Sequence, residues 1–343
     1  MTIASRSQGP LVVVLDGGYG GTEIEESVLA PFGARVVERA CHGRAAEVRR
    51  AVAGADAVLV RESPVDAEAI AAMPGCRAIV RYGVGVDNID RKAATDRRIF
   101  VANVPDYGVE EVSDHALALL LAVSRRIVSR DRAVRSGAWN IARGEPMYRL
   151  AGGTLGLVGY GRIGQAFHRK ARALGFERTR IFDPFLDSAP HGAELSDLPR
   201  LCAESDAISL HAPLTAKTRH LIGTAELALM KPTAILVNTS RGGLVDPTAL
   251  QDALARNRVF GAGLDVFEEE PPAKNNPLFA LPNVVVTDHT GWYSEESVRD
   301  LRRKASEEIA RVFGGSLPRN WVNPWDDAAL GNFIPRHNQE SLT

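Results

Sequence analysis

The segment "GYGRIG" (159–164) carries three glycines at a fixed spacing, directly after an apolar run and before an amphipathic one. They are Gly159, Gly161 and Gly164, with Arg162 and Ile163 between the last two. In a strand-to-helix turn, glycines at these positions permit a tight turn and a close approach of the backbone to a pyrophosphate. The pattern therefore predicts a dinucleotide-binding loop at a helix N-terminus, where N–H groups and the helix dipole attract phosphate.

An acidic residue follows this loop at a suitable distance. Asp183 ends the next predicted strand, nineteen residues beyond Gly164, where a carboxylate accepts hydrogen bonds from an adenosine ribose. A carboxylate there repels a 2′-phosphate, and "DPFLDS" offers no arginine to neutralise one. The sequence therefore predicts NAD rather than NADP as cofactor. The alternative for Asp183 is a turn residue at a strand end.

Short β-branched runs alternate with amphipathic segments on both sides of the loop, which is typical of parallel sheets with crossover helices. The predicted strands are 11–16, 57–61, 78–81, 99–102, 155–158, 180–183, 207–210, 235–238, 261–264 and 284–287. Single hydrophobic cores usually stop growing at roughly 250 to 300 residues. With 343 residues, the chain is predicted to be an α/β protein with two doubly wound, Rossmann-like parallel sheets.

Two long helical stretches flank the second group of strands. The stretch 109–127 begins with acidic residues that suit a helix N-terminus, and it has a broad apolar face. The stretch 294–313 opens with Ser294 and has Ser297 where a strict capping box has Glu or Gln, which predicts a partial cap. We interpret both as hinges. The predicted domains are a discontinuous one, 1–106 and 297–343, and an inserted nucleotide-binding one, 107–296, which explains why the glycine loop comes so late.

The net charge of −1 provides no global field to attract nucleic acid or anionic lipid. No apolar run reaches the roughly 18 residues of a membrane span, and the N-terminus lacks the pattern of a signal peptide. Cys41, Cys76 and Cys202 are far apart without metal-type spacing, as expected in a reducing compartment. We therefore expect a cytoplasmic protein with no metal site and no nucleic-acid or membrane partner.

Three segments after the glycine loop each place a charged residue just beyond a predicted strand. "VNTSRGGLVD" carries Arg241, "GLDVFEEEPP" carries Glu270, and "VVVTDHTGWYSEE" carries His289. Open α/β sheets bind ligands at the carboxyl ends of their strands, so these are candidate catalytic residues. Taken singly, each has a structural alternative: a surface cation, one of three solvated acids, and a loop histidine.

The ordered motifs resemble the D-isomer-specific 2-hydroxyacid dehydrogenase family, which includes phosphoglycerate, glycerate and formate dehydrogenases and the C-terminal-binding proteins. The resemblance runs from "VRYGVGVDNID" (80–90) through "VSDHALALLLAVSRR" and the segments above to "DHTGWYSEES". It implies a discontinuous substrate-binding domain around an NAD-binding domain. It also implies hydride transfer between a small 2-hydroxy acid and its 2-oxo acid. A homodimer through the NAD-binding domain is expected from the resemblance and from the apolar stretch 109–127.

By that resemblance, Arg241 binds the substrate carboxylate and polarises the 2-oxo group, His289 is the acid/base, and Glu270 is its partner. Hydride delivery to a 2-oxo carbon creates an alkoxide, which a cationic donor stabilises. Histidine changes charge near neutral pH, and a neighbouring carboxylate favours the imidazolium and holds the ring. Family members that oxidise formate pair the histidine with glutamine, so Glu270 counts against that activity.

Further positions match residues that line the cofactor in the family. They are Asp265, which matches the residue near the nicotinamide, together with Thr239 and Pro213. A buried strand-end role is the alternative for each. The chain departs from the family at Asp288, where proline usually precedes the histidine. This second carboxylate either favours the imidazolium further or points into solvent, and the sequence leaves both open.

The N-terminal part carries residues expected to face the substrate. "RYGVGVDNID" resembles the loop whose amides hold the substrate carboxylate, which places Val84 and Gly85 there. Arg61 and Arg81 match arginines that face the phosphate in phosphoglycerate dehydrogenases, and two guanidiniums suit a second anionic group. The favoured substrate is thus 3-phosphoglycerate-like, a phosphonate or a dicarboxylic hydroxy acid. Solvated strand-end arginines are the alternative.

A binding protein is the second hypothesis, because "HTGWYSEES" is most similar to the C-terminal-binding proteins, which are NADH-responsive corepressors. Trp292 resembles their pocket tryptophan, and it either rejects bulky substrates or packs at the hinge. The candidate catalytic residues do not discriminate, since those corepressors keep them. Arg61 and Arg81 favour a metabolic enzyme.

Overall fold

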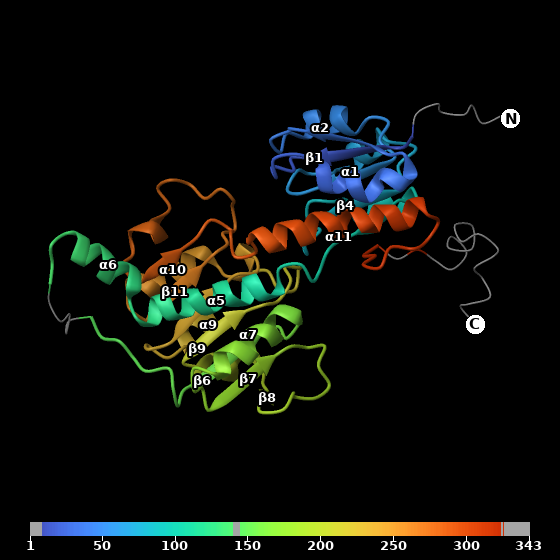
Figure 1. The fold of residues 1–343 in the computed structure, drawn as a ribbon. Coiled ribbons are helices and arrows are strands. Elements are labelled where there is room, and N and C mark those ends of the chain that lie inside the picture. Colours follow the sequence, from blue (N-terminus) through green and yellow to red (C-terminus); the bar gives the residue numbers. More distant parts are fainter. Residues whose placement is uncertain (1–8, 140–144, 324, 326–343) are drawn as a thin grey trace. The chain divides into compact units, whose positions relative to one another are not determined.

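The computed structural model describes residues 9–139, 145–323 and 325. The chain divides into two compact units. The discontinuous unit comprises Met1–Gly108 and Ser294–Thr343, and the inserted unit comprises Val109–Tyr293. The chain leaves the discontinuous unit once and returns to it through helix α11 (Glu295–Phe313) (Figure 1).

The discontinuous unit contains a five-stranded parallel sheet in the order β2-β1-β3-β4-β5. Its strands are β1 (Leu11–Leu15), β2 (Arg35–Arg39), β3 (Ala57–Val60), β4 (Ala78–Arg81) and β5 (Phe100–Ala102). Its other helices are α1 (Glu23–Leu29), α2 (Ala45–Val52), α3 (Ala67–Ala71) and α4 (Arg91–Asp96). The central strand β3 is buried along its whole length, as its continuous apolar sequence requires.

Helix α11 comes from the far end of the sequence and packs against α1 and β4 (Figure 1). Ser294 begins it with a complete reciprocal cap: its hydroxyl accepts from the amide of Ser297 at 2.9 Å, and the Ser297 hydroxyl accepts from the Ser294 amide at 2.8 Å. The expectation of a partial cap was therefore wrong, because a serine side chain reaches back as a longer Glu or Gln does.

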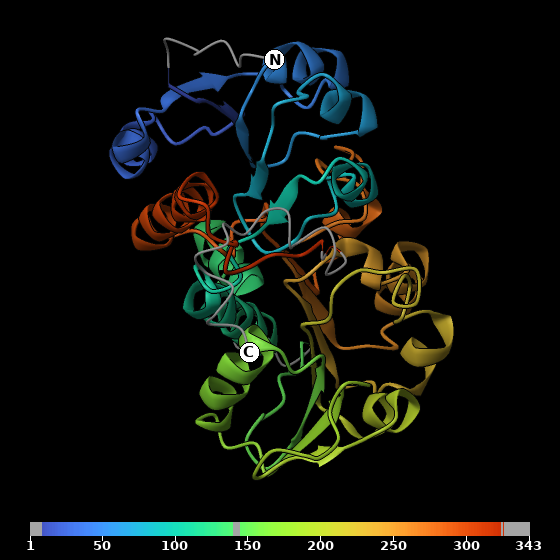
Figure 2. The same cartoon turned by 90° about the vertical axis from the view of Figure 1, so that its right-hand side faces the viewer.

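The inserted unit contains a seven-stranded parallel sheet in the order β12-β11-β10-β9-β6-β7-β8. Its strands are β6 (Thr154–Val158), β7 (Arg178–Phe182), β8 (Glu194–Leu195), β9 (Ala207–Leu210), β10 (Ile235–Asn238), β11 (Gly261–Leu264) and β12 (Val284–Val286). Its helices are α5 (Val109–Ser124), α6 (Ile127–Arg135), α7 (Arg162–Arg172), α8 (Leu198–Glu204), α9 (Thr224–Leu229) and α10 (Pro247–Ala255). Helices cover both faces of this sheet (Figures 1 and 2). The predicted α/β class with two Rossmann-like parallel sheets is confirmed.

The strand order of the inserted unit reverses between β6 and β9. Strands β7 and β8 extend the sheet on one side of β6, whereas β9 to β12 extend it on the other. Such a switch point opens a crevice at the carboxyl ends of the strands, where open α/β sheets bind ligands. The glycine loop leaves β6 at this crevice, so the fold places the predicted nucleotide loop at the expected edge.

Three elements differ from the sequence-based prediction. The stretch 109–127 is not one helix: α5 ends at Ser124, and Arg126 adopts a left-handed backbone (φ +52°) before α6 begins. Strands β2 and β8 were not predicted. Each lies at an edge of its sheet and carries charged residues, so neither has the continuous apolar pattern of a central strand.

All three cysteines are buried free thiols. Within the described ranges, no helix combines the length and apolarity needed to cross a membrane. No group of three His, Cys, Asp or Glu side chains suited to a metal ion occurs among the same residues.

Candidate active site

Two of the three glycines in the loop leave no room for a side chain, and the third faces open space. Gly159 has φ +89°, and a Cβ there would lie 2.7 Å from the amide nitrogen of Ala212. A Cβ on Gly164 would lie 2.6 Å from the carbonyl oxygen of Gly159, so helix α7 packs against the loop without room for a side chain. A Cβ on Gly161 would meet nothing within 4 Å. Gly161 is also the N-cap of α7 and has no side chain to cap the helix, so the backbone N–H groups of the first turn are not capped by it and suit a phosphate.

Asp183 supports the same loop. One carboxylate oxygen accepts from the amide of Tyr160 at 2.8 Å, and the other accepts from the amide of Phe185 at 3.0 Å. The residue is half-buried, so part of it remains accessible. Arg162 and Ile163 form the first turn of α7 directly after the loop. The structure thus brings Asp183 and the glycine loop together, and the contact with Tyr160 was not foreseen from the sequence.

Two histidines that sequence reasoning missed, the buried His168 and the half-buried His211, lie behind this loop. His168 on α7 contacts the Tyr160 hydroxyl through Nδ1 at 2.8 Å and the Thr179 hydroxyl through Nε2 at 3.0 Å. His211 follows β9, and its Nε2 lies 2.9 Å from the Ser209 hydroxyl. Burial lowers the pKa of His168 below its usual value and lowers that of His211 to about 3. Both rings are therefore neutral near pH 7 and act as packing and hydrogen-bonding groups behind the loop.

These two histidines predict a pH dependence of folding. A histidine whose pKa is lowered in the folded state stabilises the fold fully above its unfolded value near 6.5, and this contribution falls as pH decreases toward the folded pKa. For His211 the slope approaches about 1.4 kcal/mol per pH unit below pH 6.5, where the unfolded histidine is protonated and the folded one is not, and His168 adds to the fall in the same direction. We expect the free energy of unfolding in urea to fall between pH 7.5 and about 5.5, and His211→Asn to flatten the fall. An equal slope in the variant would contradict this assignment.

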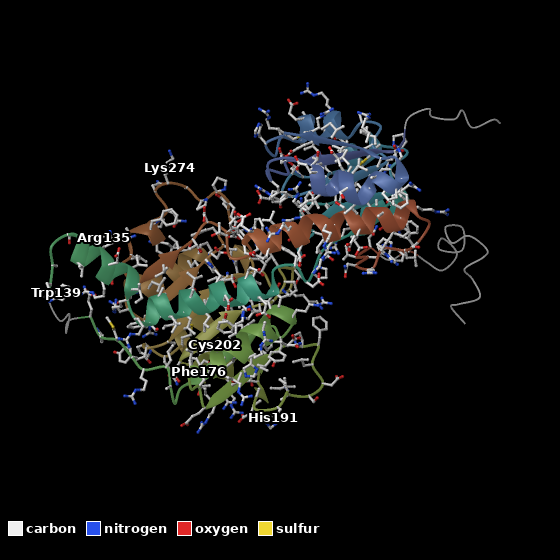
Figure 3. All side chains as sticks on the ribbon, in the orientation of Figure 1. Arg135, Trp139, Phe176, His191, Cys202 and Lys274 are labelled. Atoms are coloured by element: carbon white, nitrogen blue, oxygen red, sulfur yellow. The ribbon has the colours of Figure 1, made fainter. Side chains whose placement is uncertain are left out.

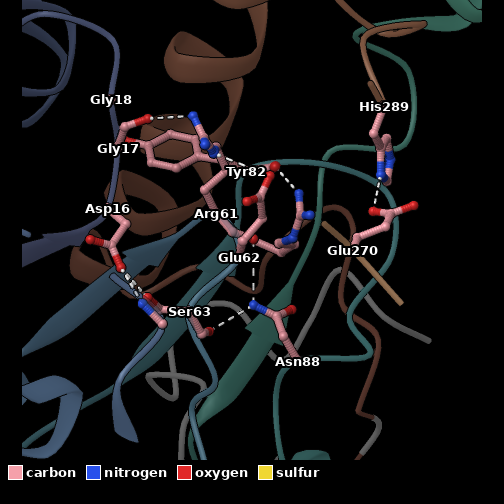
Figure 4. Close-up of polar contacts among 12 residues, drawn as sticks. Asp16, Gly17, Gly18, Arg61, Glu62, Ser63, Tyr82, Asn88, Glu270 and His289 are labelled. Carbon is pink, nitrogen blue, oxygen red and sulfur yellow. Dashed lines mark hydrogen bonds and ion pairs between the residues drawn. The ribbon is translucent and has the colours of Figure 1, made fainter. Parts of the chain in front are cut away.

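His289 and Glu270 form a close pair in the inserted unit (Figure 4). His289 Nδ1 lies 2.6 Å from Glu270 Oε2, and Glu270 Oε1 accepts from the Phe267 amide at 2.9 Å. Burial acts to raise the pKa of Glu270, but the hydrogen bond from His289 and the charges of His289 and Arg241 hold it below its usual value. An ionised carboxylate only accepts, so Nδ1 must carry a proton. Nε2 is then the ring atom available for proton transfer.

The loop that carries His289 is held in place by hydrogen bonds to Asp265. His289 adopts a left-handed backbone (φ +57°), and its amide donates to the Asp265 carbonyl at 2.9 Å. The Asp265 carboxylate accepts from the Thr290 amide at 3.1 Å and from the Gly291 amide at 2.9 Å. The hydrogen bonds that Asp265 accepts, including one from His115, lower its pKa against the opposing effect of burial. Asp265 is 2% exposed. Because its carboxylate accepts from both loop amides, this residue, which was predicted to line the cofactor, holds the backbone around His289.

Asp288 does not pair with the imidazole. Its side chain is exposed and accepts from the Thr290 hydroxyl at 3.1 Å. Within the described residues, the ion pair of His289 is with Glu270. The exposed arrangement is therefore the one that this structure adopts.

Arg241 lies close to the same pair. It precedes a short 3-10 turn (Gly242–Leu244) after β10, and its Nη1 donates to the Ser240 carbonyl at 2.7 Å. A Cβ on Gly242 would collide with the backbone of Phe267, so the two loops are in direct contact. The amide of Phe267 also donates to Glu270. The packing of Gly242 on Phe267 therefore sets the distance between the loop that carries Arg241 and the Glu270 carboxylate.

Three other predicted residues of the inserted unit are Thr239, Pro213 and Trp292. Thr239 is 8% exposed, and its enclosed hydroxyl has no partner among the described residues. Pro213 is exposed, and its carbonyl accepts from the Thr218 hydroxyl at 2.7 Å. Trp292 is half-buried and packs edge-on against Tyr293, with ring centroids 5.7 Å apart.

The predicted substrate residues of the discontinuous unit follow β3 and β4. Arg61 Nη1 donates to the Gly17 carbonyl at 3.3 Å, as Figure 4 shows, and Arg81 Nη1 donates to the Tyr82 carbonyl. Val84 is 43% exposed, and its carbonyl accepts from the side chain of Asn103 at 2.6 Å. In the described part of the chain, the amides of Val84 and Gly85 donate to no protein acceptor, so both are available to an anion.

Comparison with known proteins places these features in context. The family model "D-isomer specific 2-hydroxyacid dehydrogenase, NAD binding domain" matches residues 117–291. The chain is 44% identical over 270 residues to a glyoxylate reductase of Korarchaeum cryptofilum, covering 76% of this chain and 80% of that protein. It is 41% identical over 282 residues to a D-3-phosphoglycerate dehydrogenase of Methanocaldococcus jannaschii, covering 81% of this chain and 53% of that protein. The solved TT0316 protein of Thermus thermophilus superposes with a TM-score of 0.83 at 38% identity, covering 91% of this chain and 99% of that one.

Proposed function

The chain belongs to the D-isomer specific 2-hydroxyacid dehydrogenase family, and on that premise we propose which residues perform its reaction and which substrate it takes. The protein is an NAD-dependent oxidoreductase that interconverts a 2-hydroxy acid and its 2-oxo acid. The 2.6 Å contact between His289 Nδ1 and Glu270 Oε2 carries the assignment of residues, because it leaves Nε2 for proton transfer. We assign NAD binding to the inserted unit and substrate binding to the discontinuous unit.

The proposed roles follow from the charges and hydrogen bonds of the site. Bound NADH supplies the hydride to the 2-oxo carbon. The Arg241 guanidinium binds the substrate carboxylate and draws electron density toward the 2-oxo oxygen, which lowers the barrier to hydride attack. His289 Nε2 donates its proton to that oxygen and becomes neutral, so the product is the 2-hydroxy acid. Glu270 keeps the proton on Nδ1 and stabilises the imidazolium before transfer. In the oxidative direction neutral His289 accepts the hydroxyl proton.

The proposed substrate carries a second anionic group, as in 3-phosphoglycerate, a phosphonate or a dicarboxylate. Arg61 and Arg81 support this proposal because they stand at the carboxyl ends of the adjacent strands β3 and β4, and Arg81 precedes the loop of Val84 and Gly85 by three residues. The named relatives include a glyoxylate reductase and a phosphoglycerate dehydrogenase, whose names differ on this point. The arginines are therefore its main support.

The test of this function is NADH oxidation with a panel of 2-oxo acids of matched length, with or without a distal phosphate, phosphonate or carboxylate. Turnover of at least one acid supports the enzyme, and a higher kcat/KM with a distal anion supports the substrate class. Tight NADH binding with negligible turnover across the panel would instead support an NADH-sensing corepressor. The comparisons reported above do not favour that alternative, since the activities that they name are reductase and dehydrogenase activities.

Asp183 is proposed to select NAD through the adenosine ribose. We expect Asp183→Ala to weaken NAD binding more than NADP binding, because the substitution removes both the ribose acceptor and the charge that repels a 2′-phosphate. Asp183→Asn is the matched variant, since it keeps one acceptor oxygen for the loop amides. Fluorescence titration with each reduced cofactor measures the effect. An unchanged preference in both variants would remove Asp183 from the ribose site.

We further propose a homodimer formed through the inserted unit. Helix α6 and the residues after it expose apolar side chains: Ile127 is 55% exposed, Val134 51% and Trp139 89% (Figure 3). Apolar groups gathered on one segment are typical of a protein interface. Sedimentation at micromolar concentration is expected to give twice the 37.0 kDa chain mass. Trp139→Ser should weaken the dimer, whereas Phe185→Ser, equally exposed at 89%, should not. A single-chain mass for the wild type would disprove the dimer.

A further inference from the structure

The loop after β1, "DGGYGGT" (16–22), places a tyrosine among arginines in the discontinuous unit. The Tyr19 ring packs edge-on against Tyr82, with centroids 5.5 Å apart. The guanidinium carbons of Arg61 and Arg302 lie 5.9 Å and 5.7 Å from its centroid, respectively. Both cations therefore face the ring, and Tyr82 fixes its edge.

A buried ion pair holds this loop in place. Arg302 on α11 donates through Nε and Nη2 to Glu25, at 2.9 Å and 2.7 Å, and through Nη2 to the Gly21 carbonyl at 2.7 Å. The Tyr82 hydroxyl donates to the same Glu25 at 2.8 Å. Glu25 thus neutralises Arg302, and the network ties the loop of Tyr19 to α1, α11 and the end of β4. The position of Tyr19 is set before any ligand binds.

The Tyr19 hydroxyl lacks a partner. Its oxygen is buried, and among the described residues it makes no hydrogen bond. Burial raises the pKa of Tyr19 to about 12, against the opposing charges of Arg61 and Arg81, so the hydroxyl remains a donor at any working pH. Glu62 is 69% exposed at its side chain and lies 3.4 Å from Arg61 Nε, without accepting from Tyr19. Buried donors are normally hydrogen-bonded, and because the charges of Arg61 and Arg81 act on this hydroxyl, an anion suits it as acceptor.

The strand order brings the three side chains to one edge. Tyr19, Arg61 and Arg81 follow or end β1, β3 and β4, which are neighbours in a parallel sheet. A Cβ on Gly18 would lie 3.1 Å from Arg61 Nη1, and a Cβ on Gly83 would collide with the Arg81 guanidinium. Glycines therefore let both guanidiniums lie against the loops that follow β1 and β4. Val84 and Gly85, whose amides donate to no acceptor within the described residues, come directly after Gly83.

We propose that Tyr19 is a specificity-determining residue, whose hydroxyl donates to a tetrahedral oxyanion on the distal end of the substrate, beside Arg61 and Arg81. This inference rests on the proposed function. It adds Tyr19 as a substrate-binding residue that sequence reasoning did not identify. Donors from three separate loops match the three terminal oxygens of a phosphate monoester or phosphonate better than the two oxygens of a carboxylate.

Tyr19→Phe tests the inference, because it keeps the ring and its packing and removes only the hydroxyl. We expect kcat/KM for a 2-oxo acid with a distal phosphate to fall about tenfold, the usual effect of one hydrogen bond to a charged group. An uncharged 2-oxo acid of equal length should be unaffected, and a distal carboxylate should lose less than the phosphate. Tyr148→Phe, a tyrosine 45% exposed in the inserted unit, is the matched control.

The possible results distinguish a failure of the Tyr19 inference from a failure of the proposed second-anion substrate. If the wild type prefers the distal phosphate and Tyr19→Phe keeps that preference, the Tyr19 inference is overturned while the second-anion substrate stands. If the wild type shows no preference, both fail. An equal loss for charged and uncharged acids would show a general structural role and would overturn the inference. If no acid turns over, calorimetry with 3-phosphoglycerate in the presence of NADH decides it, since weaker binding by about tenfold in Tyr19→Phe supports the site and equal binding overturns it.

Discussion

Replacing His289 with alanine is expected to reduce turnover by about 100-fold or more while NADH binding stays unchanged. The imidazole Nε2 is the proposed proton donor to the 2-oxo oxygen, and without it that proton must come from water. NADH is proposed to bind through the glycine loop and Asp183, which make no hydrogen bond to His289 among the described residues. Single-turnover kinetics and NADH fluorescence titration measure the two quantities separately. Near-normal turnover would disprove the acid/base assignment.

Two further variants sharpen this test. Glu270→Gln keeps an oxygen for the Phe267 amide but removes the charge beside Nδ1, so we expect a smaller loss than for His289→Ala. His220 offers a matched control, because its Nε2 also lies near a glutamate, 3.0 Å from Glu268 Oε1. His220→Ala removes a histidine–glutamate pair of the same kind in the same unit and should leave turnover near the wild-type value. A comparable loss in His220→Ala would mean that the effect of His289→Ala is not specific.

Replacing Arg241 with glutamine should reduce kcat/KM by about 100- to 1000-fold, the usual effect of removing a charge-stabilising donor from an active site. The guanidinium is proposed to bind the substrate carboxylate and to stabilise negative charge on the 2-oxo oxygen, so both KM and kcat should worsen. Its charge also helps to hold the pKa of Glu270 low, and that contribution is lost in the variant. Steady-state kinetics with the best acid of the panel provides the measurement.

The geometry of the arginine can be tested apart from its charge. Arg241→Lys keeps one positive charge but loses the planar fork, so we expect a loss between those of the wild type and Arg241→Gln. Arg256→Gln is the control, because Arg256 is an exposed arginine that pairs with Asp252 at 2.8 Å on the surface of α10. Full activity in Arg241→Lys would show that charge alone suffices. Wild-type activity in Arg241→Gln would remove the residue from the site.

Local pattern alone identified much of this fold. The ten predicted strands form, because buried parallel strands must carry short continuous apolar runs that stand out in the sequence. The glycine loop and Asp183 were recognisable because their spacing reflects one strand–helix–strand unit. Edge strand β2 and the break at Arg126 were not recognisable, since a charged edge strand and a left-handed arginine leave no distinctive local pattern.

The candidate site shows the same division. The sequence and its resemblance pointed to Arg241, Glu270 and His289 as residues that follow separate strands. Their mutual geometry depends on the strand order, which brings the ends of β10, β11 and β12 side by side. Sequence reasoning assigned Asp265 to the cofactor, which stays a prediction, and it did not foresee that the buried carboxylate holds the backbone around His289.

The sequence by itself determined the parallel α/β class, the nucleotide loop with its acid, and the chemically capable residues, because each depends on neighbours along the chain. Only the tertiary structure decided that His289 pairs with Glu270 and not with the adjacent Asp288, and that His168 supports the glycine loop. The tertiary structure also buries the Tyr19 hydroxyl, with no acceptor in the part of the chain that is described, on a loop anchored by Arg302 from the far end of the chain. Such contacts join residues far apart in sequence, and their distances depend on how strands and helices pack in space.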